Sequence, residues 1–234
     1  MSTLTESATT ALELTLSSDP VLWTIVGRSL SVSATACLMA CGVGLVLGAW
    51  LGVARFTSRG AVLAVLNTLL AVPSVVVGLV VYLVLSRSGP LGSLGWLFSF
   101  KAMVLAQAIL VLPVVTALTR QTVEDAERAH GEQLRSMGAG PLLRSLLLAW
   151  DERYALLTVL LAAFGRAISE VGAVMIVGGN IDGFTRVMTT AIALETSKGD
   201  LPLALALGLI LILIALLVNV AADVVKTRAQ RLEG

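Results

Sequence analysis

Two oppositely charged residues, Arg166 and Glu170, stand inside the otherwise apolar stretch "FGRAISEVGAVMIVGGN" (164–180). A charge at the centre of a bilayer costs at least about 2.5–3.5 kcal/mol on insertion scales, so such residues need a physical reason. Four positions apart, they share one face of a helix and can form an ion pair. That pair either fastens the helix to its neighbours or places a positive charge beside the path of an anion, and the spacing leaves both interpretations open.

The composition indicates whether the chain lies in water or in a membrane. Of the 234 residues, 57% are hydrophobic and only 13% are charged, and the mean hydropathy is +0.93. Soluble domains carry about 25% charged residues. The chain is therefore predicted to be an integral membrane protein.

Long runs without a formal charge predict five membrane spans. A helix needs about 20 apolar residues, within a range of about 17–25, to cross a hydrocarbon core of about 30 Å. The predicted spans are approximately 29–54, 61–85, 102–120, 154–177 and 201–222. We expect an all-α fold with one transmembrane domain over 23–226, an extracytoplasmic tail over 1–22 and a cytoplasmic tail over 227–234.

The cations predict the orientation. Most of the 16 Lys and Arg residues fall in segments that are cytoplasmic if the N-terminus is outside, namely Arg55, Arg59, Arg120, Arg128, Arg135, Arg144, Arg153, Lys226, Arg228 and Arg231. The outer segments then hold Arg87, Lys101, Arg186 and Lys198. Cytoplasmic loops carry the excess of Lys and Arg, so the N-terminus is predicted outside and the C-terminus inside.

Several kinds of chemistry lack the residues that they need. His130 is the only histidine, which excludes His-based zinc sites and Ser-His-Asp catalysis within one chain. No G-x-x-x-x-G-K-[ST] motif occurs, since none of the three lysines follows a glycine. Cys37 and Cys41 are interpreted as small packing residues. We expect no catalytic site, no cofactor, no metal and no nucleic-acid partner.

The first span carries a stripe of small residues at every fourth position: Ala36, Ala40, Gly44, Gly48 and Gly52. Small side chains let helix backbones approach closely in lipid. This face is predicted to pack either within the chain or against a second copy. Pro73 and Pro113 are predicted to kink the second and third spans, because proline removes a backbone hydrogen bond.

The longest cytoplasmic segment, 121–152, has an architecture of its own. "QTVEDAERAHGEQLRSM" is polar and helix-forming, so the third helix is predicted to extend beyond the membrane. "GAGP" (138–141) breaks it, and Pro141 suits the first position of a new helix. Leu143, Leu146 and Leu147 then share one face. The segment is either a docking element or an amphipathic hairpin on the membrane surface.

This segment resembles the EAA loop of permease subunits of ABC importers, whose pattern is E-A-A-x-x-x-G. Glu132 matches the acid and Gly138 the glycine, while Gln133 and Leu134 replace the alanines and "LAWD" replaces the usual I-x-L-P ending. The flanks "LNTLLAVPSVVVGLVVYLVLSRSGPLGSLGWLFS" and "GRAISEVGAVMIVGGNIDGFTRVMTTAIALETSKGD" are similar to permeases of tungstate-type oxyanion importers, relatives of the molybdate permeases. The resemblance covers roughly residues 25 to 222.

The resemblance implies a type I ABC importer permease in the cytoplasmic membrane of a bacterium or archaeon. It implies a homodimer, two copies of an ABC ATP-binding subunit that hydrolyses the ATP, and an extracytoplasmic oxyanion-binding protein. The residues implied for coupling to the ATP-binding subunit are Glu132, Gly138, Ala139 and Pro141.

For the translocation path or its gate we expect Arg166 and Glu170, with the polar side chains Asn67, Gln107 and Asn180 at plausible depth. Each of the last three can equally tie helices together by hydrogen bonds. The transported anion is expected to be tungstate, with molybdate or another small anion as the alternative. A passive anion channel is a further alternative, and it would conduct without ATP. An intramembrane enzyme is disfavoured, because the sequence offers no nucleophile or metal cluster at membrane depth.

Overall fold

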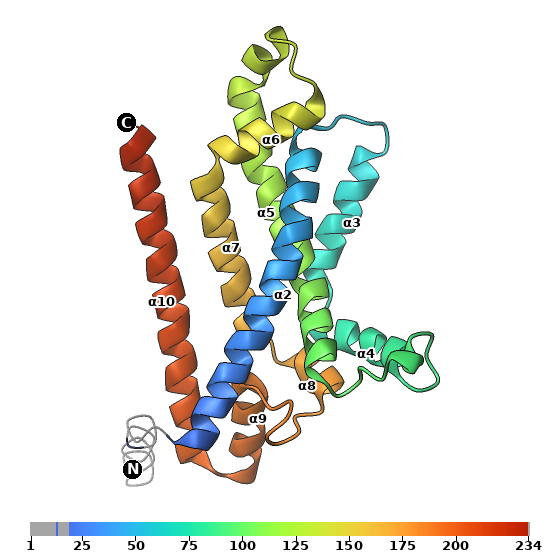
Figure 1. Ribbon diagram of the computed structural model, residues 1–234, viewed down its shortest axis with the longest axis vertical. Helices are drawn as coiled ribbons and strands as arrows, with labels where there is room; N and C mark the ends of the chain where they lie inside the picture. The colour runs from blue at the N-terminus through green and yellow to red at the C-terminus, as the bar shows by residue number, and fades with distance from the viewer. Residues whose placement is uncertain (1–12, 14–18, 234) are drawn as a thin grey trace. The chain divides into compact units, whose positions relative to one another are not determined.

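The computed structural model describes residue 13 and residues 19–233 of the chain. Within these residues every regular element is a helix, either one of nine α-helices or a short 3-10 helix, and no strand is present (Figure 1). The predicted all-α fold is confirmed. Most of the predicted N-terminal tail (1–12 and 14–18) and Gly234 of the predicted C-terminal tail lie outside the described residues.

The helices follow one another along the chain as α2 (Pro20–Val53), α3 (Arg59–Ala71), α4 (Ser74–Leu85), η1 (Gly92–Leu94), α5 (Phe100–Ser136), α6 (Pro141–Asp151), α7 (Arg153–Ile168), α8 (Gly172–Gly178), α9 (Met188–Lys198) and α10 (Leu201–Glu233). Among the described residues, α2, α5 and α10 are each long and apolar enough to cross a membrane. Two pairs broken at short gaps, α3 with α4 and α7 with α8, raise the number of candidate spans to five. A helix or a broken pair therefore occupies each predicted span.

The two prolines that were predicted to kink spans behave differently. Between α3 and α4 the helix stops before Pro73, where Val72 adopts an extended conformation (φ −65°, ψ 127°). Proline disfavours the helical conformation of the residue before it, which explains this break. Pro113, in contrast, lies inside α5, which runs unbroken from Phe100 to Ser136. The predicted interruption of the second span is confirmed, whereas the third helix continues through its proline.

The fourth span differs from the continuous helix expected over 154–177. Helix α7 ends at Ile168 and α8 begins at Gly172. Glu170 therefore lies in the break, and the expectation that it shares a helical face with Arg166 is wrong. Its side chain takes the place of a missing backbone partner, because Oε1 of Glu170 accepts the N–H of Ala173 in the first turn of α8 at 3.3 Å.

The described chain forms two compact units. The first comprises the residues up to Ala36, together with Pro73–Gln107 and Arg166–Leu217. The second comprises Cys37–Val72, Ala108–Gly165 and the residues from Val218 onward. Helices α2, α5, α7 and α10 each contribute residues to both units.

In the first unit, glycines bring α4 and α8 into close contact. A Cβ on Gly78 would lie 2.7 Å from Cα of Ala173, and one on Gly172 would lie 2.8 Å from a methyl carbon of Val75. Neither position has room for a side chain. These contacts set the start of α8 against α4, directly after the break that contains Glu170.

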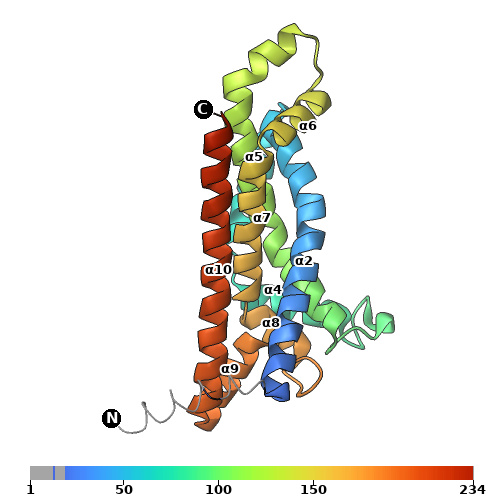
Figure 2. The ribbon, with the colours of Figure 1, turned by 60° about the vertical axis from the view of Figure 1, so that its left-hand side comes forward.

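In the second unit, the small-residue stripe of α2 packs on α5. A Cβ on Gly44 would lie 2.9 Å from Val115, one on Gly48 would lie 2.6 Å from the backbone oxygen of Thr116, and one on Gly52 would lie 3.0 Å from Val123. The intrachain alternative for these three glycines is therefore correct. Figures 1 and 2 both show α5 continuing past the end of α2 before the chain turns into α6.

Helix α9 was not predicted from the sequence, where 178–200 was taken as a connection between two spans. Met188 and Ala191 of this helix are fully buried, and Glu195 is 5% exposed. The helix is short and contains polar residues, so neither its length nor its composition separates it from a loop. Its burial in the first unit identifies it as part of the core.

Candidate functional site

The ion pair predicted between Arg166 and Glu170 is present in the first unit. An Nη atom of Arg166 donates to a carboxylate oxygen of Glu170 at 2.8 Å. The side chain of Glu170 is 4% exposed, whereas that of Arg166 is 44% exposed. The pair therefore presents a positive group at the surface of the unit and keeps the negative partner inside it.

Glu170 has several partners besides the arginine. Its carboxylate also accepts the N–H of Ala173 and a hydrogen bond from the side chain of Ser74. Its backbone carbonyl accepts the hydroxyl of Thr189, from α9, at 2.7 Å. Both the side chain and the main chain of this residue are thus held, and helices α4, α8 and α9 converge on the break.

Gln107 of α5 bonds to the last turn of α7. Its Nε2 donates to the backbone oxygen of Ala167 at 2.9 Å, while its Oε1 is buried and has no partner among the described residues. A crevice too narrow to hold a water molecule runs beside it, with polar walls formed by Ser29, Ser33, Gln107, Glu170 and Thr189. The structure therefore brings Gln107, Arg166 and Glu170 together around the break.

Among the described residues, neither of the two asparagines predicted with them bonds to Gln107, Arg166 or Glu170. Asn180 follows α8 with a left-handed conformation (φ 49°), and its amide donates to the backbone oxygen of Thr190 at 3.3 Å. Its own amide oxygen is buried without a partner in the described part of the chain. Asn67 belongs to the second unit, where it is exposed on α3. The side-chain bond of Asn180 connects the segment after α8 with α9.

Three of the four predicted coupling residues, Gly138, Ala139 and Pro141, lie at the turn between α5 and α6. Gly138 adopts φ 79°, a left-handed conformation that favours glycine. The N–H of Ala139 bonds to the oxygen of Leu134, and that of Gly138 to the oxygen of Arg135. This is the Schellman pattern that closes the end of a helix. Pro141 then begins α6, as the sequence predicts.

Helix α6 buries one face and exposes the other. Leu148 packs in a small core with Ala49, Val53, Val123 and Ala126 of the second unit. The exposed large apolar side chains at this place are Met137, Leu142, Leu143, Leu146, Leu147 and Trp150. Glu132, the acid of the predicted motif, is exposed on α5. The predicted apolar face of Leu143, Leu146 and Leu147 is thus confirmed as a surface.

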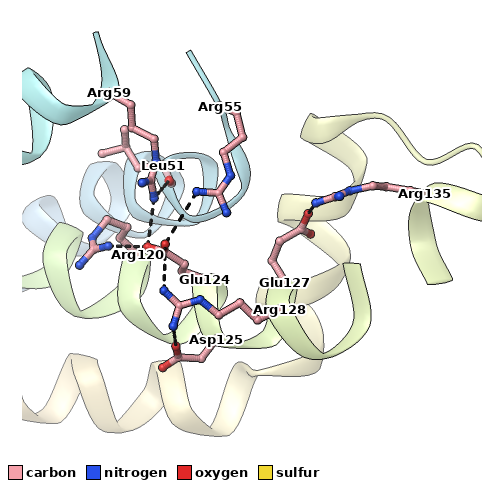
Figure 3. Close-up of polar contacts among 9 residues, drawn as sticks. All are labelled: Leu51, Arg55, Arg59, Arg120, Glu124, Asp125, Glu127, Arg128 and Arg135. Carbon is pink, nitrogen blue, oxygen red and sulfur yellow. Dashed lines mark hydrogen bonds and ion pairs between the residues drawn. The ribbon is translucent and has the colours of Figure 1, made fainter. Parts of the chain in front are cut away.

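Two buried acids of α5, Glu124 and Glu127, were not singled out in the sequence. Glu124 is contacted by four arginines, with nearest distances of 3.0 Å for Arg59, 3.3 Å for Arg128 and 3.9 Å for Arg55, and a closer one for Arg120 (Figure 3). Arg59 also donates to the backbone oxygen of Leu51. The carboxylate therefore ties the segment between α2 and α3 to α5.

The charges around Glu124 also change its acidity. Glu124 lies outside the third predicted span (102–120). Burial raises the pKa of this carboxyl, but the hydrogen bond and charge of Arg59, with the charges of Arg120 and Arg128, outweigh burial and lower the pKa below its ordinary value. The carboxylate form is the one that the arginines stabilise.

Part of the ion-pair network around Glu124 can be predicted from the sequence. Arg120, Glu124 and Arg128 are spaced by four residues, which places them on one helix face. The remaining partners, Arg55 and Arg59, are far away along the chain and no local pattern connects them to α5. Among the described residues no group of acids, histidines and cysteines could hold a metal ion.

Comparison with known proteins gives a consistent result. The family model described as "Binding-protein-dependent transport system inner membrane component" matches residues 44–231, most of the chain. The tungstate uptake system permease protein TupB of Peptoclostridium acidaminophilum is 43% identical over 219 residues, which cover 94% of this chain and 96% of that protein.

Two further proteins are also similar to this chain. A probable anion ABC transporter permease protein of Haloferax volcanii is 43% identical over 218 residues, covering 91% of this chain and 94% of its own length. The molybdenum transport system permease protein ModB of Escherichia coli K12 is 28% identical over 190 residues, covering 76% and 82%. The similarity spans both units and the α5–α6 turn.

Proposed function

The chain belongs to the family of binding-protein-dependent transport system inner membrane components, and we propose that the anion it carries is tungstate. Membership makes it a multi-pass membrane permease of an ABC uptake system. The observation that carries the choice of anion is the 43% identity over 94% of the chain to a tungstate permease, against 28% to a molybdate permease. Molybdate or another small oxyanion is the alternative substrate.

The proposed assembly contains two copies of this chain, two ATP-binding subunits and an extracytoplasmic binding protein. ATP hydrolysis is assigned to the separate subunit because the sequence lacks a phosphate-binding G-x-x-x-x-G-K-[ST] motif. The ATP-binding subunit is proposed to dock on the exposed face of α6 and on the turn of Gly138, Ala139 and Pro141, with Glu132 beside it. Exposed leucines and Trp150 on a short helix support a protein partner there.

The proposed orientation has the N-terminus outside, residues 121–152 in the cytoplasm and residues 178–200 outside. Cysteines at Ser136 and Ser197, in a background without Cys37 and Cys41, should react with an impermeant thiol reagent from opposite sides of the membrane. Both hydroxyl positions are exposed, so accessibility does not bias the comparison. Labelling of both from one side would overturn this topology.

The proposed path passes the break between α7 and α8. The half-exposed guanidinium of Arg166 attracts a dianion, and Glu170 next to it prevents strong retention. Gln107 lies at the same break, and Asn67 and Asn180 are proposed as further polar groups along the path. The support for this proposal is the arrangement of a surface cation over a buried acceptor network.

The deciding experiment is uptake by the reconstituted complex. The chain, its ATP-binding subunit and the binding protein are placed in proteoliposomes, and labelled tungstate is supplied outside with ATP inside. We expect accumulation that requires ATP and that molybdate inhibits only at higher concentration. Equal inhibition by molybdate would favour the alternative substrate, and conductance from this chain alone would favour a channel.

A further inference from the structure

Helix α5 continues beyond the third predicted span (102–120), and Glu127 is the most deeply buried acid of that continuation. Glu127 is not part of the proposed docking surface. Its side chain is 1% exposed. Nη2 of Arg135 donates to its carboxylate at 2.6 Å, and Nε of Arg144 lies 3.3 Å from it. Arg135 is on the same helix, whereas Arg144 is on α6. The buried carboxylate of Glu127 therefore connects α5 with α6.

Arg144 makes a second bond that strengthens this connection. Its Nη1 donates to the backbone oxygen of Ala139 at 3.0 Å, and its side chain is only 12% exposed. One planar guanidinium thus joins the acid on α5, the turn after Gly138 and α6 itself. Two bonds of different direction from one rigid group fix orientation as well as distance, which an ammonium group does not do.

The helix surface under the carboxylate is shaped for it. A Cβ added to Gly131 would lie 2.6 Å from Cδ of Glu127 and 2.8 Å from one of its oxygens. Glycine lowers helix stability relative to alanine, so its presence inside α5 needs a reason. The close approach of the Glu127 carboxylate supplies one, because any side chain at position 131 would displace it.

We propose that Glu127 is a positioning residue for coupling, one that holds α6 at a fixed place against α5 so that a push on α6 reaches the membrane helices. The inference rests on the proposed docking of the ATP-binding subunit on α6. Since α6 buries little besides Ser145 and Leu148, the Arg144–Glu127 link is a main constraint on its orientation. Loss of the link should leave the complex assembled but let α6 move without α5.

The test compares Glu127→Gln and Gly131→Ala with wild type in the complete reconstituted complex. Glutamine keeps the shape but removes the charge, and alanine keeps Glu127 but displaces it. For both variants we expect the ratio of ATP hydrolysed to tungstate imported to rise about tenfold, the size expected from losing a coupling contact. Gly60→Ala is the matched control, because a Cβ there meets nothing within 4 Å.

A purely structural role gives a different pattern. In that case hydrolysis and uptake fall together, the ratio stays constant, and the complex loses thermal stability in parallel; this result would overturn the proposal. Arg144→Lys adds a graded measurement, since it keeps the charge and loses the second bond, and its ratio should lie between wild type and Glu127→Gln. If Glu127→Gln does not insert, an unchanged ratio in Gly131→Ala alone refutes the inference.

The docking premise is tested separately in the otherwise wild-type chain. A cysteine at Leu146, which is 59% exposed, should cross-link to the ATP-binding subunit through a short reagent with one thiol-reactive and one photoreactive end. Absence of this cross-link contradicts the docking itself. Its presence together with an unchanged hydrolysis-to-uptake ratio in Glu127→Gln and Gly131→Ala contradicts only the role given to Glu127.

Discussion

Glu124 and Glu170 are both buried acids, but the chain satisfies them in opposite ways. Glu124 sits on an unbroken helix and is contacted by four arginines. Glu170 sits in a break between helices and contacts one arginine, while a backbone N–H and the Ser74 side chain supply its other bonds. The first acid is surrounded by excess positive charge, and the second is held mostly by neutral donors.

The difference follows from the surroundings that each acid can use. Arg55 and Arg128 around Glu124 are 58% and 67% exposed, so water solvates the charges that the carboxylate leaves uncompensated. Inside a bilayer every extra cation would carry a large desolvation cost. Ending a helix frees backbone N–H groups, which provide bonds to a carboxylate without adding charge. A break between helices can therefore hold one buried acid within a predicted span with few additional charges.

The largest expected effect is on stability at Glu124. Glu124→Gln removes the negative partner of four guanidinium groups, of which those of Arg59 and Arg120 belong to side chains only 16% and 23% exposed. Breaking such buried charge pairs costs about 3–5 kcal/mol. The free energy of unfolding in mixed micelles should fall by about that amount. Asp125→Asn on the same helix, where the acid is 62% exposed, should change it by less than about 0.5 kcal/mol. Equal losses in the two variants would mean that the arginines do not depend on Glu124.

A second effect should appear in transport at Arg166, and it is measured per folded complex, because loss of the cation also leaves the buried carboxylate of Glu170 without its charged partner. Two unit charges at about 4 Å interact by about 4 kcal/mol at an effective dielectric constant near 20, and about 1.4 kcal/mol already changes a rate tenfold. Arg166→Gln keeps a hydrogen bond to Glu170 and loses the charge, so tungstate uptake should fall at least about tenfold. Arg166→Lys keeps the charge and should retain most of the uptake.

The level of folded complex in the membrane is the control for these two variants. If Arg166 only fastens the break, glutamine and lysine should transport equally well whenever their folded levels match. That outcome would remove Arg166 from the path and leave the pair as a structural contact.

A smaller effect is expected at Gln107. Gln107→Leu removes the amide donor to the carbonyl of Ala167 at the end of α7, and a hydrogen bond of this kind contributes about 1 kcal/mol to stability. Thr68→Val, which removes an exposed hydroxyl bonded only within its own helix, is the matched control. Identical unfolding free energies for the two variants would show that the break does not rely on Gln107.

The smallest effect concerns pH. The lowered pKa of Glu124 means that its contribution to stability is complete above the unfolded value of about 4.3 and is lost only as pH falls through the lower folded value. Unfolding free energy measured between about pH 7 and 5 should therefore show no pH dependence from this group, whose stabilising contribution is constant there. Below about pH 4 wild type should lose stability more steeply than Glu124→Gln, and parallel curves would contradict the lowered pKa.

Features that depend on local pattern were predicted well from the sequence. Apolar runs located a helix or a broken pair in every expected span, and "GAGP" located the turn, with Gly138 in the left-handed conformation and Pro141 at the start of α6. Each of these features is decided within a few residues by backbone sterics.

Features that depend on contacts between distant segments were predicted poorly. The break at Glu170 is not marked by proline, and it is stabilised by Gln107, Ser74 and Thr189, from three other segments. Similarly, no local pattern connects Glu127 to Arg144, which bonds to it from another helix, although two of its other neighbours, Gly131 and Arg135, lie near it in the sequence. The two most enclosed carboxylates thus depend on contacts that no local pattern reveals, although Glu170 and its pairing with Arg166 were predicted from their spacing.

The packing of α2 on α5 also determines which amino-acid substitutions α2 tolerates. At Gly48 the nearest neighbour of an added methyl group is the backbone oxygen of Thr116, at 2.6 Å, and no rotamer change can move a carbonyl aside. Gly42, six residues earlier on the same helix, meets nothing within 4 Å. A complete substitution map of α2 should therefore be sharply uneven, with Gly48 intolerant even of alanine and Gly42 open to it, so that sequence drift along this helix is confined to the face turned away from α5.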